Sequence, residues 1–145
     1  MFLRAIRLTA SADYSPEQVA VWARNDIDVE SWAAKRAAAG TIVAVVDDAV
    51  AGFTDVDGSG YIDMMFVDPR CARRGVASAL LARVLNVASE RKVDDLSVHA
   101  SVTARPFFER HGFFVIEEQH SIRDGVTMVN FRMSGSVPEI RDSNA

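Results

Sequence analysis

Three arginines followed by a glycine form a positive segment that could bind a phosphate-containing ligand. Arg70, Arg73 and Arg74 fall within five positions, and Gly75 comes directly before a run of apolar residues at helical spacing. The first N–H groups of a helix lack partners and carry the positive end of its dipole, so a pyrophosphate satisfies both. Gly75 lets the main chain approach such a ligand, and the small Ala77 keeps the first helical turn clear. A solvated loop between a strand and a helix is the alternative.

A carboxylate between apolar neighbours is the first candidate for proton transfer. Asp63 stands between Ile62 and Met64 in a predicted strand. Burying a carboxylate costs free energy unless it is paired, and desolvation would raise its pKa towards that of a useful base. The alternative is a carboxylate that the backbone or an arginine satisfies. We also predict His99 as a base or substrate contact and Tyr61 as a proton donor, with a structural role as the alternative for each.

Length and composition are those of one globular domain. The chain has 145 residues, of which 49% are hydrophobic and 25% charged. Its net charge of −4 argues against nucleic acid as the main partner, since phosphate binding needs a basic face. The single cysteine, Cys71, excludes an intrachain disulfide and a cysteine-based zinc cluster, and His111 and His120 lack metal-ligand spacing, so we expect no metal. No apolar run approaches the roughly 18 residues that span a bilayer, and we therefore expect a cytoplasmic protein that binds no membrane.

Apolar periodicity and turn residues predict alternating strands and helices. Residues 2–8 alternate as a strand would, and helices are expected from Pro16, behind the N-cap Ser15, and over Val29–Ala39. Further strands are expected over 41–46, 50–56, 61–67, 96–100, 113–117 and 126–133, and further helices over 75–91 and 102–111. This order predicts an α/β domain over residues 1–133, and residues 134–145 are expected to be a polar, frayed tail.

Two segments resemble markers of the GNAT superfamily of acyl-coenzyme A-dependent N-acyltransferases. The first is Val67-Asp68-Pro69, five residues and then Gly75-Val76-Ala77-Ser78-Ala79-Leu80-Leu81, which resembles the coenzyme A signature of that family. The second, Ala104–Phe113, resembles the family's helix that ends in an aromatic pair, a few polar residues and Gly-Phe. The opening Tyr14-Ser15-Pro16-Glu17-Gln18 resembles a bacterial subgroup of the family. The resemblance implies a single layered α/β (α+β) domain whose mixed, mostly antiparallel central sheet of about seven strands carries helices on both faces.

The resemblance also implies a ligand and a reaction. Acetyl-coenzyme A would be the co-substrate, and its pantetheine arm would lie where strand 61–67 splays from strand 96–100, paired with the main chain of Met65, Phe66 and Val67. Its pyrophosphate would lie on the N–H groups of residues 73–78, in a site made of Arg70, Arg73, Arg74, Gly75, Val76, Ala77 and Ser78. A primary amine of a small molecule or peptide would attack the thioester directly, and the enzyme would act by positioning, polarisation and proton handling.

Two positions depart from the family pattern. Ala72 stands where the family often has glutamine or arginine, and Phe108, which lies in the implied cofactor site, stands where many members carry a tyrosine that protonates the departing thiolate. Phenylalanine cannot donate a proton, so the alternative function is a domain that binds or senses acyl-coenzyme A without turnover. Tyr14 is the candidate for lining the acceptor pocket. Asp55, Asp57 and Asp63 could give that pocket a negative field, or they could simply be turn residues. We expect a monomer or a homodimer.

Overall fold

The computed structural model describes residues 1–24 and 27–144. Its strands are β1 (Ile42–Val46), β2 (Ala49–Thr54), β3 (Tyr61–Ile62), β4 (Met65–Val67), β5 (Asp95–Ser101), β6 (Phe114–Arg123) and β7 (Val126–Ser136). Its α-helices are α1 (Phe2–Arg4), α2 (Pro16–Trp22), α3 (Val29–Ala38), α4 (Val76–Glu90), α5 (Arg105–Arg110) and α6 (Val137–Ser143). Short π or 3-10 turns are η1 (Ala5–Thr9), η2 (Ala10–Ala12) and η3 (Pro69–Cys71).

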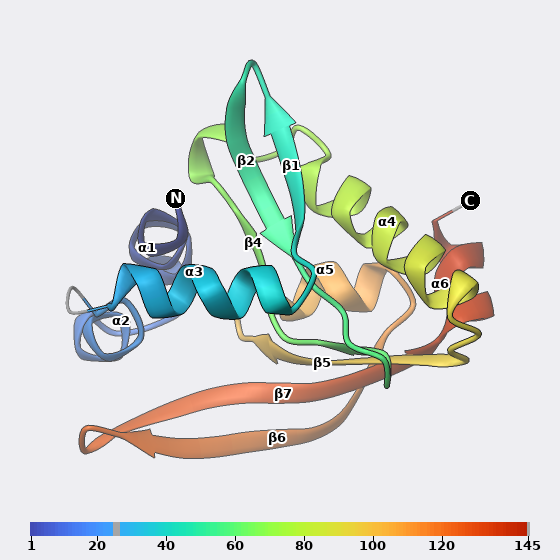
Figure 1. Ribbon diagram of the computed structural model, residues 1–145. Coiled ribbons are helices and arrows are strands. Elements are labelled where there is room, and N and C mark those ends of the chain that lie inside the picture. The colour runs from blue at the N-terminus through green and yellow to red at the C-terminus, as the bar shows by residue number, and fades with distance from the viewer. Residues whose placement is uncertain (25–26, 145) are drawn as a thin grey trace.

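The strands form two sheets that share one layered domain (Figure 1). The smaller sheet has the antiparallel order β1-β2-β4, and the larger has the order β3-β5-β7-β6, in which only β3 and β5 run parallel. Helices cover both faces of the larger sheet, because Phe131 and Met133 of β7 pack in the core with α4 and α6, whereas Met128 packs on the other face with Ile6. The α/β class is therefore confirmed.

The expectation of a strand over residues 2–8 is wrong, because this segment is helical through α1 and η1. Alternation placed Ile6 and Leu8 on one face, but a helix instead brings Phe2, Ile6 and Ala10 together at a spacing of four. Ile6 is buried and Leu8 is 62% exposed, which fits the helix and not the strand. Residues 1–24 and 27–144 still contain seven strands, because the predicted strand 61–67 is divided into β3 and β4.

The frayed tail is also not found. β7 continues to Ser136, whose hydroxyl accepts the N–H of Glu139 and so caps α6. Val137 and Ile140 of this helix are buried in the same core as α4 and β5. Although most residues of the segment are polar, it forms an amphipathic helix that buries its apolar face. Ala145, the last residue of the predicted tail, lies outside the described residues.

The helix α4 lies very close to the smaller sheet. A Cβ on Gly52 of β2 would lie 2.7 Å from the carbonyl oxygen of Phe66 and 3.1 Å from Val76 of α4. The absence of a side chain at Gly52 thus sets the first turn of α4 against β4. In residues 1–24 and 27–144, no helix is long and apolar enough to cross a membrane.

Candidate functional site

The predicted strand 61–67 is interrupted at Asp63 and Met64. Before the break, Tyr61 and Ile62 pair with β5; after it, Met65, Phe66 and Val67 pair with β2 of the other sheet. β4 and β5 therefore separate beyond the break, and the expected splay is present. Figure 1 shows α3 crossing in front of the region where the two sheets separate.

Asp55 holds the break in place. Its Oδ1 accepts the main-chain N–H groups of Asp63 at 3.2 Å and Met64 at 3.4 Å, and its own N–H donates to the Met64 carbonyl at 3.2 Å. The Thr54 hydroxyl donates to the same carbonyl at 2.8 Å. Both N–H groups and one carbonyl of the break are thereby satisfied on the side of β2.

Main-chain groups of β4 remain open towards the gap. Bonds from Asp55 to Met64 and from Asp68 to Ala51 fix the hydrogen-bonded pairs of the ladder. In an antiparallel ladder such pairs alternate with non-bonded ones, so Phe66 bonds to β2, whereas the N–H and C=O groups of Met65 and Val67 point away from it. Among the described strands, β2 is the only neighbour of β4 in the sheet. Of the predicted trio, Met65 and Val67 thus present the polar edge that an extended ligand can pair with.

A cavity of about 270 Å³ occupies the gap. Its walls include Met65, Phe66 and Val67 of β4, Val98–Ser101 of β5, and Phe108 of α5. Phe108 is 2% exposed and packs edge-on against Phe107 and Phe113, so it closes the apolar end. Ala77 of α4 also lines this cavity, which therefore extends to the first turn of that helix.

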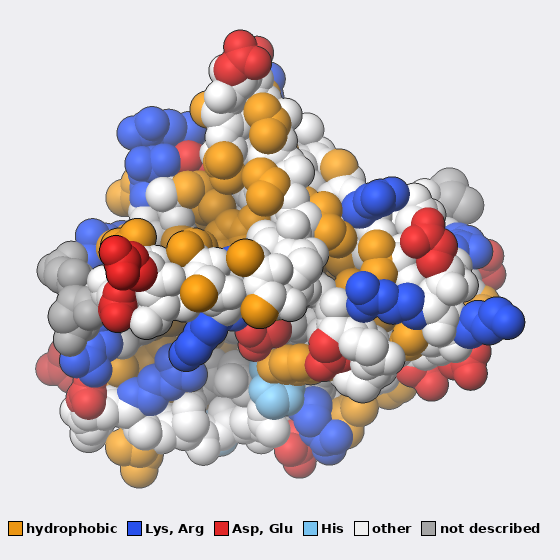
Figure 2. Space-filling model, viewed as in Figure 1, with side chains coloured by type: hydrophobic (Ala, Val, Ile, Leu, Met, Phe, Trp, Pro, Cys, Tyr) orange, Lys and Arg blue, Asp and Glu red, His pale blue; other side chains and the backbone are white. Residues whose placement is uncertain are grey.

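The start of α4 has the features of an anion site. Gly75 is its N-cap in the left-handed conformation, with φ of +75°, and no side chain caps the helix. The N–H groups of Val76, Ala77 and Ser78 precede the first intrahelical bond, from Ala79 to Gly75. Figure 2 shows basic side chains gathered over the loop between β4 and α4, where the exposed arginines are Arg70, Arg73 and Arg74. These residues fit a pyrophosphate group.

The loop before this helix is held in place by Asp68. The Asp68 carboxylate accepts two hydrogen bonds from Arg4 and one from the N–H of Arg70. These bonds lower the pKa of Asp68 to about 2. Arg74 reaches Asp47 only as an exposed pair at 3.9 Å, so its guanidinium is held weakly.

A second cavity, of about 720 Å³, adjoins the first. Six residues line both: Trp22, Asp63, Met64, Phe66, His99 and Ser101. Tyr61 and Tyr14 line the second cavity but not the first. The structure therefore places Asp63 and His99 at the junction of the two cavities, and Tyr61 beside them, with its ring against that of His99.

Asp63 is not the buried carboxylate that its apolar neighbours indicated. Its side chain is 51% exposed and receives a bond of 3.2 Å from Arg36, because it lies in the strand break and points to the cavity. The buried carboxylate is Asp55, 3% exposed, whose pKa is raised by burial and lowered, to a smaller extent, by Arg36. Sequence reasoning offered Asp55 either as part of an acceptor field or as a turn residue, and it missed Arg36. The available signal was a pair of basic residues, Lys35 and Arg36, among the alanines of a predicted helix.

Tyr61 of β3 and His99 of β5 lie against each other on neighbouring strands of the larger sheet. Their rings meet edge to face with centroids 5.3 Å apart. Burial raises the pKa of Tyr61, and nearby carboxylates raise it further, so its phenol keeps its proton. The Tyr14 hydroxyl donates to the Val129 carbonyl and accepts the Val102 N–H, both at 2.8 Å. Tyr14 thus lines the second cavity with a hydroxyl that is already engaged.

No group of three or more metal-binding side chains occurs in the parts of the chain that the structure describes. Asp57 is engaged in a turn, where its carboxylate accepts the N–H groups of Ser59 and Tyr61. Of the three carboxylates considered for an acceptor field, only Asp63 lines a cavity.

Comparisons with known proteins agree with this architecture. A family model described as an acetyltransferase (GNAT) domain matches residues 10–134. An uncharacterised N-acetyltransferase of Escherichia coli strain K12, YafP, is 44% identical over 133 residues, which cover 92% of this chain and 83% of that protein.

Solved structures show the same fold. A GCN5-related N-acetyltransferase from Rhodopseudomonas palustris superposes with a TM-score of 0.87 at 29% identity, over 93% of this chain and 84% of that one. The PaiA N-acetyltransferase of Thermoplasma acidophilum, solved in complex with coenzyme A, superposes with a TM-score of 0.70 at 16% identity, over 92% of this chain and 87% of that one. The matched domain and the extent of the identity to YafP place the chain in the GNAT family of acetyltransferases.

Proposed function

We propose that this chain is an N-acetyltransferase that transfers the acetyl group of acetyl-coenzyme A to a primary amine by direct attack. The observation that carries the proposal is the continuity of the cavities. One path leads from the uncapped start of α4, past the open edge of β4, to the junction where Asp63 and His99 line both cavities. The PaiA structure, which contains coenzyme A, supports the choice of ligand.

Binding would use main-chain groups more than side chains. The N–H groups of Val76, Ala77 and Ser78 would hold the pyrophosphate, with charge added by the three arginines of the loop. The polar edges of Met65 and Val67 would pair with the pantetheine arm, and Phe108 would pack against it. Ala72 is exposed and takes no part in this arrangement, so the missing glutamine or arginine does not exclude it.

Proton handling falls to Asp63 and His99 at the junction and to Tyr61 beside them. Acetyl-coenzyme A supplies an activated thioester carbonyl. The Asp63 carboxylate orients the amine, and an imidazole nitrogen of His99 removes a proton from it. Tyr61 retains its phenolic proton because burial raises its pKa, and it donates that proton to the leaving group. This is the role that Phe108 cannot fill.

The charged residues of the second cavity could contact the acceptor. Among the described residues, its lining includes Asp63, which shares Arg36. It also includes Arg123 and an ion pair of 3.2 Å between Arg24 and Asp124. The proposed acceptor is a primary amine of a small molecule or a peptide, which Asp63 would attract, and a monomer or homodimer in the cytoplasm is the proposed form.

Thermal unfolding with acetyl-coenzyme A, coenzyme A and ATP at matched concentrations tests the ligand. A ligand that binds only the folded state at 100 times its Kd stabilises it by about 2.7 kcal/mol. We expect the melting temperature to rise with both coenzyme A species and to stay unchanged with ATP. No shift with either coenzyme A species would refute the proposal.

The buried Phe108 keeps a second function in view, a domain that binds acyl-coenzyme A without turnover. An assay of free thiol release from acetyl-coenzyme A, run with a panel of monoamines and matched diamines, distinguishes the enzyme from the binding domain. Thiol release that depends on the amine and falls in His99→Ala and Tyr61→Phe supports the enzyme. Binding without thiol release from any amine supports the sensor.

A further inference from the structure

We propose that Asp55 and Arg36 are positioning residues of the transfer reaction, which hold the chain break at Asp63–Met64 and join it to α3. Neither side chain lines either cavity, so both act through their neighbours. The inference rests on the proposed function, because positioning matters only if a cofactor and an amine meet in this gap.

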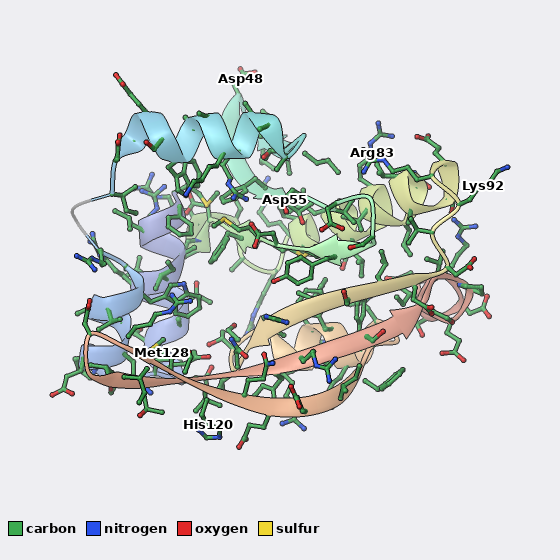
Figure 3. All side chains as sticks on the ribbon, turned by 60° about the horizontal axis from the view of Figure 1, so that its bottom comes forward. Asp48, Asp55, Arg83, Lys92, His120 and Met128 are labelled. Atoms are coloured by element: carbon green, nitrogen blue, oxygen red, sulfur yellow. The ribbon has the colours of Figure 1, made fainter. Side chains whose placement is uncertain are left out.

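The Asp55 carboxylate connects the interior to the main chain of the break. Figure 3 shows it beneath α3, whereas Asp48 lies at the outer tip of the β1–β2 hairpin. One oxygen accepts the N–H groups of Asp63 and Met64, and the other accepts Nη1 of Arg36 at 2.5 Å. A single buried carboxylate therefore fixes two consecutive peptide groups and one helix.

Arg36 extends this connection to the cavity. Its Nη1 binds Asp55 and its Nη2 binds Oδ2 of Asp63 at 3.2 Å, while its side chain is only 12% exposed. A guanidinium is planar and presents its donors in a rigid fork. The fork thus sets the separation between the buried carboxylate and the one that faces the acceptor. A lysine at position 36 carries its three donors on one freely rotating nitrogen and would not set this separation.

Stability alone accounts poorly for this pair. A buried ion pair repays its desolvation only with very good geometry, and apolar replacements of similar volume are often neutral or stabilising. Burial raises the pKa of Asp55 despite the opposing effect of Arg36, so ionising this carboxylate costs more than it would in water. Within the described residues, Nε of Arg36 also has no hydrogen-bond partner. A costly pair next to the junction indicates a role in geometry.

The effect on chemistry follows from chain connectivity. Met65 comes directly after the two N–H groups that Asp55 holds, so their orientation sets the open edge that faces the gap. The Asp63 carboxylate is set from the other side by Arg36. Misplacement of a reacting group by about 1 Å costs about 100-fold in rate. Loss of the pair should therefore alter both the cofactor edge and the acceptor carboxylate.

The test compares Asp55→Asn, Arg36→Met and Arg36→Lys with Asp28→Asn. Asp28 is the matched control, because its carboxylate also accepts two consecutive main-chain N–H groups, those of Glu30 and Ser31, but lines neither cavity. For each variant, the Kd of coenzyme A is measured by calorimetry, and kcat and KM are measured for acetyl-coenzyme A and for the amine. Hydrogen exchange of the Asp63 and Met64 amides reports on the break without any ligand.

The variants should differ in a defined order. Arg36→Met should lower kcat about 100-fold and raise the KM of the amine, since the Asp63 carboxylate loses its support. Arg36→Lys should have the wild-type Kd for coenzyme A, but its KM for the amine should stay above that of the wild type. Asp55→Asn should raise the Kd of coenzyme A about 10-fold, equal to about 1.4 kcal/mol, and speed exchange of both amides. Asp28→Asn should stay within about twofold of the wild type in each quantity, because asparagine caps a helix as well as aspartate does.

Three results would count against the inference. If Arg36→Met and Asp55→Asn lower the melting temperature but leave Kd, KM and kcat unchanged, the pair is only structural and the proposed function stands. If the wild type does not bind coenzyme A, the proposed function and this inference fall together. Should Arg36→Met not fold, Arg36→Lys decides, because it keeps the charge. An unchanged KM for the amine in that variant would contradict the role of the fork.

Discussion

Replacing Gly75 by alanine tests whether the start of α4 holds the cofactor. The residue has a φ of +75°, and a Cβ there would meet nothing within 4 Å. The cost is therefore conformational rather than steric, about 1 kcal/mol, or about 4 °C in the melting temperature of a domain of this size. Gly125, in the turn between β6 and β7, has a φ of +76° and equally open surroundings. Gly125→Ala should carry the same cost and is the matched control.

Binding should distinguish the two variants. Alanine at position 75 relieves its strain by moving to the right-handed region, which would lengthen α4 backwards and reorient the N–H groups of Val76 and Ala77. Arg73 already has a φ of +62°, so the loop has little freedom to compensate. A hydrogen bond to a charged group contributes about 1.5–3 kcal/mol, so losing one raises the Kd of coenzyme A about 10- to 100-fold.

Calorimetry with coenzyme A and thermal unfolding of the unliganded protein together give the answer. We expect equal losses of melting temperature in the two variants and weaker binding in Gly75→Ala alone. Equal Kd values in Gly75→Ala and the wild type would refute the assignment of the pyrophosphate to this helix. Equally weakened binding in Gly125→Ala would show that general destabilisation, and not the helix start, is being measured.

Three other changes test separate parts of the structure. The hydrogen bond from Arg4 lowers the pKa of Asp68 to about 2. The ionised carboxylate therefore stabilises the fold above its ordinary pKa, and this stabilisation is lost as the pH falls towards about 2. Asp68→Asn should make the unfolding free energy decrease less between about pH 5 and pH 2. Urea unfolding across that range checks this. Tyr14→Phe should cost about 1–3 kcal/mol in urea, since its hydroxyl bonds to two main-chain groups, and an unchanged stability would contradict that bridge. Ile140→Ala should cost about 3 kcal/mol, because Ile140 is fully buried; a loss below about 1 kcal/mol would show that α6 is not part of the core.

The helix α4 could be predicted because several local signals agree there. Apolar residues recur at helical spacing over Val76–Glu90, and a glycine stands where the chain needs a positive φ. The first helical segment lacked such agreement. Over residues 2–8 a period of two and a period of four fit almost equally well, and only the burial of Ile6 against other elements decides between them.

Whether the C-terminal segment forms a helix depends on contacts with residues that are distant in the sequence. Ile140 packs where Gly135 and Gly112 leave space, since a Cβ on either would lie about 3 Å from atoms of that residue. Two glycines distant from each other in sequence therefore make room for one isoleucine. Periodicity within residues 134–145 is too short to indicate this, because a helix of two turns gains its stability from packing rather than propensity.

The same reasoning explains why the wrong aspartate was expected to be buried. Apolar neighbours indicate a buried strand only if the strand is continuous, and the chain breaks at Asp63 because β3 and β4 join different sheets. The break exposes Asp63 and creates unpaired N–H groups, and a carboxylate must come from elsewhere to satisfy them. Asp55 does so from the end of β2. The residue types present at the junction could thus be read from the sequence, whereas the assignment of one carboxylate to the cavity and the other to the interior arises from the pairing of the two sheets.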